Sequence, residues 1–118
     1  MGQVVLVAED DPSVRMTIEF VLNDEGFEVL LAEDGEQALK VALESIPDVI
    51  LLDQIMPKMD GKEVLTALRA DDSTKDIPVL VLTGMARGEA SEWPGATFVG
   101  KPFSPDALVQ RIREVLAN

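Results

Sequence analysis

The sequence predicts an α/β protein in which a parallel β-sheet is covered by helices on both faces. Along its 118 residues, segments typical of strands alternate with segments typical of helices, as in chains built from βαβ units. One expected strand contains the unbroken apolar run Val49-Ile50-Leu51-Leu52, which indicates that both faces of that strand are buried. The length and a hydrophobic fraction of 47% fit a single domain over residues 1–118.

Three strands and two helices are expected in the first half of the chain. The strands span residues 3–8, 28–32 and 48–52. The first helix ends at Gly26 and carries four apolar residues at helical spacing: Val14, Ile18, Val21 and Leu22. The second helix begins after Gly35, is closed by Pro47, and has four apolar residues on one face: Ala38, Leu39, Ala42 and Leu43.

The second half of the chain continues the alternation, with one weak segment. A helix is expected over residues 61–70, a strand over 78–82, a short strand over 96–99, and a last helix that opens with Ser104 and Pro105. The last helix is expected to bury four apolar residues: Leu108, Ile112, Val115 and Leu116. Between residues 84 and 95 the glycines and a proline disfavour a long helix, so we expect no more than one or two turns near 86–92.

The composition excludes several classes of function. The formal net charge is −12, and only Arg111 and Arg113 form a dense basic stretch, so direct binding to nucleic acid or to anionic membranes is not expected. The absence of cysteine and histidine excludes disulfides, thiolate chemistry and the usual zinc sites. No apolar run approaches the ~20 residues needed to cross a bilayer. We therefore expect a soluble cytoplasmic protein.

The most informative feature is the type of residue at the ends of four of the five expected strands. Acidic, hydroxyl and basic side chains stand at the ends of four strands: Glu9, Asp10 and Asp11, then Asp53, Thr83 and Lys101. In an open parallel sheet the carboxyl ends of the strands form the crevice where ligands bind. Carboxylates that converge there repel one another unless a divalent cation lies between them. The pattern therefore predicts a magnesium-dependent site.

Four motifs at these strand ends carry a family resemblance over nearly the whole chain. They are Val7-Ala8-Glu9-Asp10-Asp11-Pro12, the segment 53–61 with Asp53, Pro57 and Gly61, then Thr83-Gly84, and Lys101-Pro102-Phe103. In this order they resemble the receiver domain of bacterial two-component response regulators, in particular single-domain, chemotaxis-regulator-like members. The resemblance implies a doubly wound, flavodoxin-like sheet of five parallel strands in the order 2-1-3-4-5, flanked by five helices. The short interval between Thr83 and Lys101 implies a shortened fourth helix.

The resemblance also implies a role for each site residue. Asp53 matches the phosphoacceptor, and Mg²⁺ would be held by Asp10, Asp53 and the backbone carbonyl of Ile55, with Glu9 acting through a water. Lys101 would pair first with the acceptor carboxylate and then with a phosphoryl oxygen, and the bond to Pro102 is cis in the family. Thr83 would donate its hydroxyl to the phosphoryl group, and Thr83 and Phe98 would form the switch.

The implied function is phosphoryl transfer in signalling. A sensor histidine kinase or a phosphotransfer protein would supply the phosphohistidine, Asp53 would accept the phosphoryl group, and binding to a downstream protein effector would change. Such a domain assists its own phosphorylation and dephosphorylation but turns over no separate substrate as an enzyme does. We expect the effector to be another molecule, unless the native chain continues past Asn118.

Some alternatives stay open at this point. A receiver-like interaction module that works without phosphorylation would share the fold. Asp11 fits a helix cap better than a metal ligand, and Phe98 fits a plain core position as well as a switch. Trp93 either fills the space left by the shortened segment or anchors a partner from the surface.

Overall fold

Five parallel strands form one sheet in the order β2-β1-β3-β4-β5, which confirms the predicted topology. The structure, a computed structural model, describes residues 2–83, 93, 95–100 and 103–117. The strands are β1 (Val4–Ala8), β2 (Glu28–Ala32), β3 (Val49–Asp53), β4 (Val79–Thr83) and β5 (Ala96–Gly100). The chain therefore crosses over from β2 past β1 to β3, and the point where the order reverses lies between β1 and β3, where ligands bind in folds of this type.

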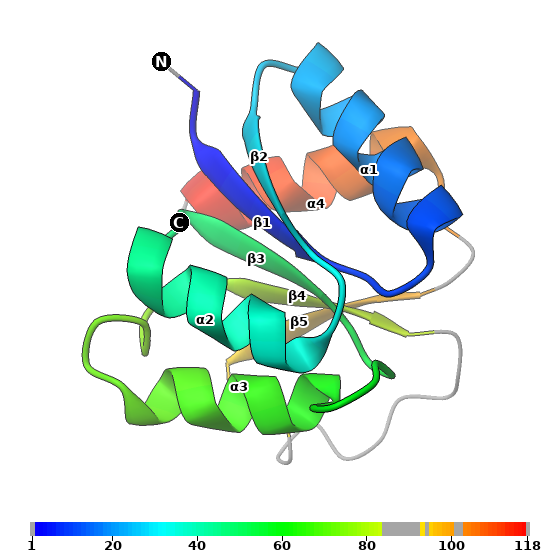
Figure 1. Ribbon diagram of the computed structural model, residues 1–118. Helices are drawn as coiled ribbons and strands as arrows, with labels where there is room; N and C mark the ends of the chain where they lie inside the picture. The colour runs from blue at the N-terminus through cyan, green and yellow to red at the C-terminus, as the bar shows by residue number, and fades with distance from the viewer. Residues whose placement is uncertain (1, 84–92, 94, 101–102, 118) are drawn as a thin grey trace.

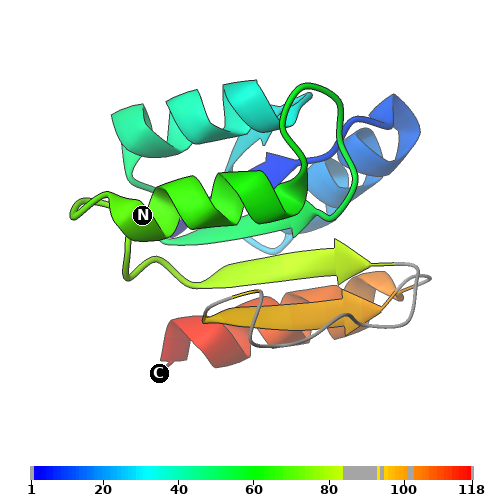
Figure 2. The same ribbon diagram turned by 90° about the horizontal axis from the view of Figure 1, so that it is seen from below.

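Four helices in the described part of the chain cover both faces of the sheet (Figures 1 and 2). They are α1 (Pro12–Asp24), α2 (Gly35–Ser45), α3 (Gly61–Ala70) and α4 (Pro105–Ala117). Helices α1 and α4 lie on one face, and α2 and α3 lie on the other. The sheet is therefore doubly wound, as predicted. The short helix expected near residues 86–92 falls outside the described residues.

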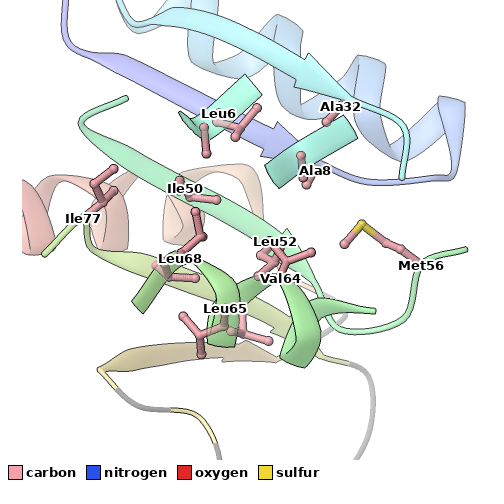
Figure 3. Close-up of a cluster of buried hydrophobic side chains, with 14 of the residues drawn as sticks. Leu6, Ala8, Ala32, Ile50, Leu52, Met56, Val64, Leu65, Leu68 and Ile77 are labelled. Atoms are coloured by element: carbon pink, nitrogen blue, oxygen red, sulfur yellow. The ribbon is translucent and has the colours of Figure 1, made fainter. Parts of the chain in front are cut away.

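Successive residues of the central strands contribute to two separate hydrophobic clusters, one on each face. Leu6, Ile50 and Leu52 point toward α2 and α3, where they meet Val64, Leu65 and Leu68 (Figure 3). The residues between them in the strands point toward α1 and α4: Val5, Val7, Val49 and Leu51. This alternation follows from the two-residue period of a strand. It explains why β1 is apolar throughout and β3 is apolar up to Asp53, its last residue.

The strand ends differ from the sequence expectation by one residue. β3 and β4 end at Asp53 and Thr83 rather than at the preceding leucines, because backbone pairing continues through both polar residues. The hydrogen-bond ladder between strands does not depend on side-chain polarity, whereas the expected bounds followed the last apolar residue.

Within α2, Leu43 was expected on the buried face but is exposed, since it lies at the edge of the stripe formed by Ala38 and Ala42.

Three aspartates that follow strands or loops are helix caps. Asp11 Oδ1 accepts hydrogen bonds from the backbone N–H groups of Ser13 and Val14, at 2.9 and 3.4 Å. Asp34 caps α2, and Asp60 forms a reciprocal capping box with Glu63. Such caps typically contribute about 1 kcal/mol each. The interpretation of Asp11 as the cap of α1 is confirmed.

Trp93 belongs to the hydrophobic core on the α2 and α3 face. Its side chain is only 5% exposed, and its ring meets the ring of Phe98 edge-on, with centroids 5.8 Å apart and an interplanar angle of 74°. Edge-to-face pairs of this kind are favourable beyond the burial of their surface. Trp93 is therefore a buried core residue, and its predicted role in filling the space left by the shortened segment stays a prediction, because residues 84–92 fall outside the described part of the chain. The alternative, an exposed anchor for a partner, is wrong.

Among the described helices, none has the length and apolar character needed to cross a membrane.

Candidate functional site

Three carboxylates gather at the carboxyl end of the sheet. Glu9 and Asp10 follow β1, and Asp53 ends the adjacent strand β3, whose Leu52 is paired with Ala8. Each of the three acids offers a carboxylate oxygen that lies within 4.8 Å of the other two. Glu9 and Asp53 are 1% and 7% exposed, whereas Asp10 is exposed to solvent. The structure thus brings together the acids that the sequence placed at the ends of separate strands.

Glu9 is held from three sides. Its backbone N–H donates to the carbonyl of Ala32 on β2 at 3.1 Å, and its Oε2 accepts from the backbone N–H of Asp11 at 3.1 Å. The guanidinium of Arg15 donates from α1 to the carbonyl of Glu9 at 2.8 Å. The hydrogen bond from Asp11 reaches the carboxylate itself, whose burial is costly without such partners, while the other two contacts hold the backbone of Glu9. These contacts fix Glu9 against the sheet, where its charge faces the cluster.

Arg15 is a residue that the sequence reasoning missed. Its Nη1 also lies 3.5 Å from the carbonyl of Asp10, so it spans the turn that carries both acids. A signal was available, because a cation near a helix N-terminus is disfavoured by the helix dipole. Its presence there indicates neighbouring acceptors or acids that outweigh this cost.

Asp53 and Thr83 lie at the ends of neighbouring strands, and Gln54 connects them. The N–H of Gln54 donates to the carbonyl of Leu82 at 3.1 Å, which extends the ladder beyond the pair Asp53 and Leu82. Gln54 therefore lies opposite Thr83, and the hydroxyl of Thr83 donates to Oε1 of Gln54. The sequence analysis assigned no role to Gln54.

The loop between β3 and α3 is held close to Asp53 by Gly61. The N–H of Gly61 donates to the carbonyl of Gln54 at 2.9 Å. A Cβ at Gly61 would lie 2.6 Å from the carbonyl oxygen of Asp53, so only glycine allows this approach. Met56 anchors the loop in the core, while Ile55, two residues after Asp53, is 66% exposed. The predicted use of the Ile55 carbonyl as a metal ligand stays a prediction.

The fifth strand places the predicted switch residue Phe98 beside β4. Phe98 is half-buried opposite Val81, and Gly100 lies opposite Thr83. Phe98 thus shares a sheet face with Val81 and Thr83, since residues two apart point the same way. Lys101 and Pro102 fall outside the described residues. Their predicted roles, including the cis bond between them, stay predictions.

The donor set fits a hard divalent cation. Glu9, Asp10 and Asp53 supply oxygen ligands only, which is the chemistry that Mg²⁺ prefers. Two unit charges about 5 Å apart repel by about 3 kcal/mol at an effective dielectric constant near 20. Three mutually repelling carboxylates in one place therefore favour the binding of a cation.

A comparison with known protein families decides what this site belongs to. The family described as the response regulator receiver domain matches residues 5–113 of the chain. The chain belongs to this family. The resemblance seen in the four motifs is confirmed, and the chain is a receiver domain of the two-component response regulators, a phosphoacceptor signalling domain.

Curated relatives of this receiver domain include transcriptional regulators. The phosphate regulon transcriptional regulatory protein PhoB of Escherichia coli K12 is 38% identical over 122 residues, which cover 98% of the chain and 52% of PhoB. The chain spans about half the length of the curated relatives it matches. The similarity to PhoB therefore concerns the receiver part of that protein.

Solved structures of receiver domains superimpose on the whole sheet. The chemotaxis response regulator CheY4 of Vibrio cholerae has a TM-score of 0.90 at 34% identity, with 98% of this chain and 99% of CheY4 covered. The receiver domain of the sensor histidine kinase PA1611 from Pseudomonas aeruginosa PAO1 has a TM-score of 0.91 at 29% identity, with both chains fully covered. That structure contains a magnesium ion coordinated in its active site cleft.

The far end of α3 in this receiver domain carries charged groups with a structural role. Arg69 Nη1 donates to the carbonyls of Lys75 and Ile77, at 2.9 and 2.8 Å, and burial lowers its pKa although Asp76 opposes this effect. Hydrogen bonds from the side chain and backbone of Ser73 lower the pKa of Asp71. These contacts fold the connection from α3 to β4, at a distance from the carboxyl edge of the sheet.

Proposed function

We propose that this receiver domain accepts a phosphoryl group on Asp53 from the phosphohistidine of a sensor histidine kinase or phosphotransfer protein. The product changes the affinity of the domain for a downstream protein effector. The observation that carries the proposal is the position of Asp53, a nearly buried carboxylate at the end of β3 that is grouped with Glu9 and Asp10. Residues 1–118 act as a single domain in this proposal.

Two of the other strand-end acids, Glu9 and Asp11, are less suitable as acceptors. Asp11 is committed to capping α1, and Glu9 is held by the backbone of Asp11 and Ala32.

In the transfer, the bond between phosphorus and the imidazole nitrogen breaks as a bond from phosphorus to an oxygen of Asp53 forms. The imidazole leaves with the bonding electron pair and takes up a proton. A carboxylate is a modest nucleophile, so positioning and neutralisation of charge supply most of the acceleration.

Glu9, Asp10 and Asp53 are the residues that would hold Mg²⁺, together with the carbonyl of Ile55 and with Glu9 acting through water. When bound, the ion would supply positive charge that stabilises the negative charge of the acceptor carboxylate and of the phosphoryl group. The magnesium ion in the active site cleft of the PA1611 receiver domain supports this assignment. Glu9 and Arg15 set the position of the turn that carries Asp10.

Thr83 and Lys101 complete the site in this proposal. The ammonium of Lys101 pairs with Asp53 and then follows the charge to a phosphoryl oxygen, since it is a point charge on a flexible stem. The Thr83 hydroxyl donates to another phosphoryl oxygen. Phe98 shares a sheet face with Thr83, so inward movement of Thr83 changes the space that the Phe98 ring can occupy.

Intact-mass measurement after incubation with acetyl phosphate and Mg²⁺ tests the proposal. Wild type is expected to gain one phosphoryl group, and Asp53→Asn none, because the amide is no nucleophile toward phosphorus. Asp72→Asn is the matched control, because Asp72 is a fully exposed acid outside the cluster, and it is expected to behave as wild type. If wild type gains no mass, or Asp53→Asn gains as much, the proposal is wrong and a phosphorylation-independent interaction module is the better account.

We predict that the phosphorylated domain persists for minutes or longer. The exposed side chain of Ile55, two residues after Asp53, has no group that can orient an attacking water. Ile55→Asn, which adds such a group, is expected to shorten the lifetime. The control is Ile46→Asn at the end of α2, an exposed isoleucine in a left-handed conformation that asparagine tolerates. Decay of the phosphorylated mass after removal of acetyl phosphate gives the lifetime, and a wild-type value of seconds would contradict the prediction.

A further inference from the structure

The hydroxyl of Thr83 is engaged by Gln54 in the unphosphorylated domain. Its proton is donated to Oε1 of Gln54, and that amide oxygen can only accept. A hydroxyl has a single proton to donate. Thr83 therefore cannot donate to a phosphoryl oxygen until its hydrogen bond to Gln54 is broken.

Backbone hydrogen bonds of both its N–H and its carbonyl fix Gln54 in place, so its side-chain contact with Thr83 follows from the fold of the site. Its N–H donates to Leu82 at 3.1 Å, and its carbonyl accepts from Gly61 at 2.9 Å. The first bond places Gln54 opposite Thr83 in the parallel ladder, where paired residues project to the same face of the sheet. The second bond fixes the start of the loop that leads to α3. The side chain of Gln54 is half-buried, which limits competition from water.

We propose that Gln54 is a positioning residue. It holds Thr83 in the position that Thr83 has in the unphosphorylated domain and thereby weakens the binding of a phosphoryl group at Asp53. This inference rests on the proposed function, because it concerns the hydroxyl that serves the phosphoryl group. Phosphorylation exchanges one hydrogen bond of Thr83 for another, and the amide of Gln54 must then find a new partner. Removal of the amide removes this competition. The domain then reaches its phosphorylated conformation more easily.

Beryllofluoride with Mg²⁺ is a suitable probe, because beryllium and its fluorides stand in for the phosphorus and oxygens of the phosphoryl group. Gln54→Met keeps the length of the side chain and removes the amide. It is expected to lower the apparent Kd for beryllofluoride about fivefold, the effect of one net hydrogen bond. Amide chemical shifts followed during titration report the Kd. Gln54→Ala is a second variant with the same expected direction.

A double-mutant cycle separates this role from a general effect on the fold. In a Thr83→Val background, Gln54→Met is expected to change the Kd by less than about twofold, because the competition requires the hydroxyl. Gln110→Met makes the same chemical change at an exposed position of α4 and is expected to leave the Kd unchanged. A structural role alone would not produce tighter binding that depends on Thr83.

The results that would overturn the inference differ from those that would overturn the proposed function. If wild type binds beryllofluoride and gains a phosphoryl group, but both Gln54 variants bind it with unchanged or weaker affinity, the inference is wrong. An equal gain in affinity with and without Thr83→Val would also refute it. Failure of wild type to accept a phosphoryl group would instead refute the proposed function.

Discussion

Asp10→Asn is expected to slow phosphorylation by acetyl phosphate about 10²- to 10³-fold at a fixed Mg²⁺ concentration. A metal ion contributes several kcal/mol of charge stabilisation in reactions of this kind, and each 1.4 kcal/mol or so is tenfold in rate. Asp10 is the exposed member of the carboxylate cluster, so its replacement by the isosteric amide removes a ligand charge without opening a cavity. The initial rate of the mass increase measures the effect.

The adjacent residue provides the control for this experiment. Asp11→Asn makes the same chemical change one position later, but Asp11 caps α1 through Ser13 and Val14, and asparagine caps helices equally well. Asp11→Asn is therefore expected to keep the wild-type rate. A wild-type rate in Asp10→Asn, or equal loss in both variants, would show that Asp10 is not the acid that binds the metal.

Trp93→Ala is expected to lower the free energy of unfolding by about 3–5 kcal/mol, the usual cost of truncating a buried large aromatic residue. Trp93 is 5% exposed and packs edge-on against Phe98 in the cluster beneath α2 and α3. Its removal leaves a cavity at the edge of the sheet next to β5. Denaturant unfolding followed by far-UV circular dichroism measures the loss, because this signal does not depend on the tryptophan itself.

An exposed aromatic residue gives the matched comparison. Phe20 on α1 is 72% exposed, so Phe20→Ala is expected to change the free energy of unfolding by no more than about 0.5 kcal/mol. If Trp93→Ala costs as little as Phe20→Ala, Trp93 does not belong to the core. The role assigned to it in filling the space beside β5 would then be incorrect.

Much of the fold could be predicted because apolar runs in the sequence identify the central strands. β1 is apolar at every position, and β3 and β4 are apolar up to their last residue, since both faces are covered, and the helices show apolar residues at helical spacing. The polar residues that follow Ala8, Leu52 and Leu82 mark one edge of the sheet. Parallel pairing then brings Glu9 and Asp53 together without further information. The strand order came from the resemblance to receiver domains, because hydrophobic patterns do not specify which strands are neighbours.

The features that could not be predicted depend on register and side-chain direction. The contact between Gln54 and Thr83 requires that the ladder between β3 and β4 continue one residue past Asp53 and Leu82. The cation at position 15 indicated nearby acceptors, but not that Arg15 reaches back to the carbonyl of Glu9 across the first turn of α1. Trp93 could fill space or face solvent until its contact with Phe98 was known. In each case the decisive quantity is a distance between residues of different elements.

The central claim is that Glu9, Asp10 and Asp53 form one specific cation site within a strongly acidic chain. Mn²⁺ accepts the same oxygen ligands as Mg²⁺, and its unpaired electrons broaden the NMR signals of nearby nuclei. At substoichiometric Mn²⁺, the amide signals of Glu9, Asp10 and Gln54 are expected to broaden first, while those of the acidic segment 71–76 remain sharp. Broadening of the 71–76 signals at the same Mn²⁺ concentration would show that cations follow surface charge alone and would contradict the claim.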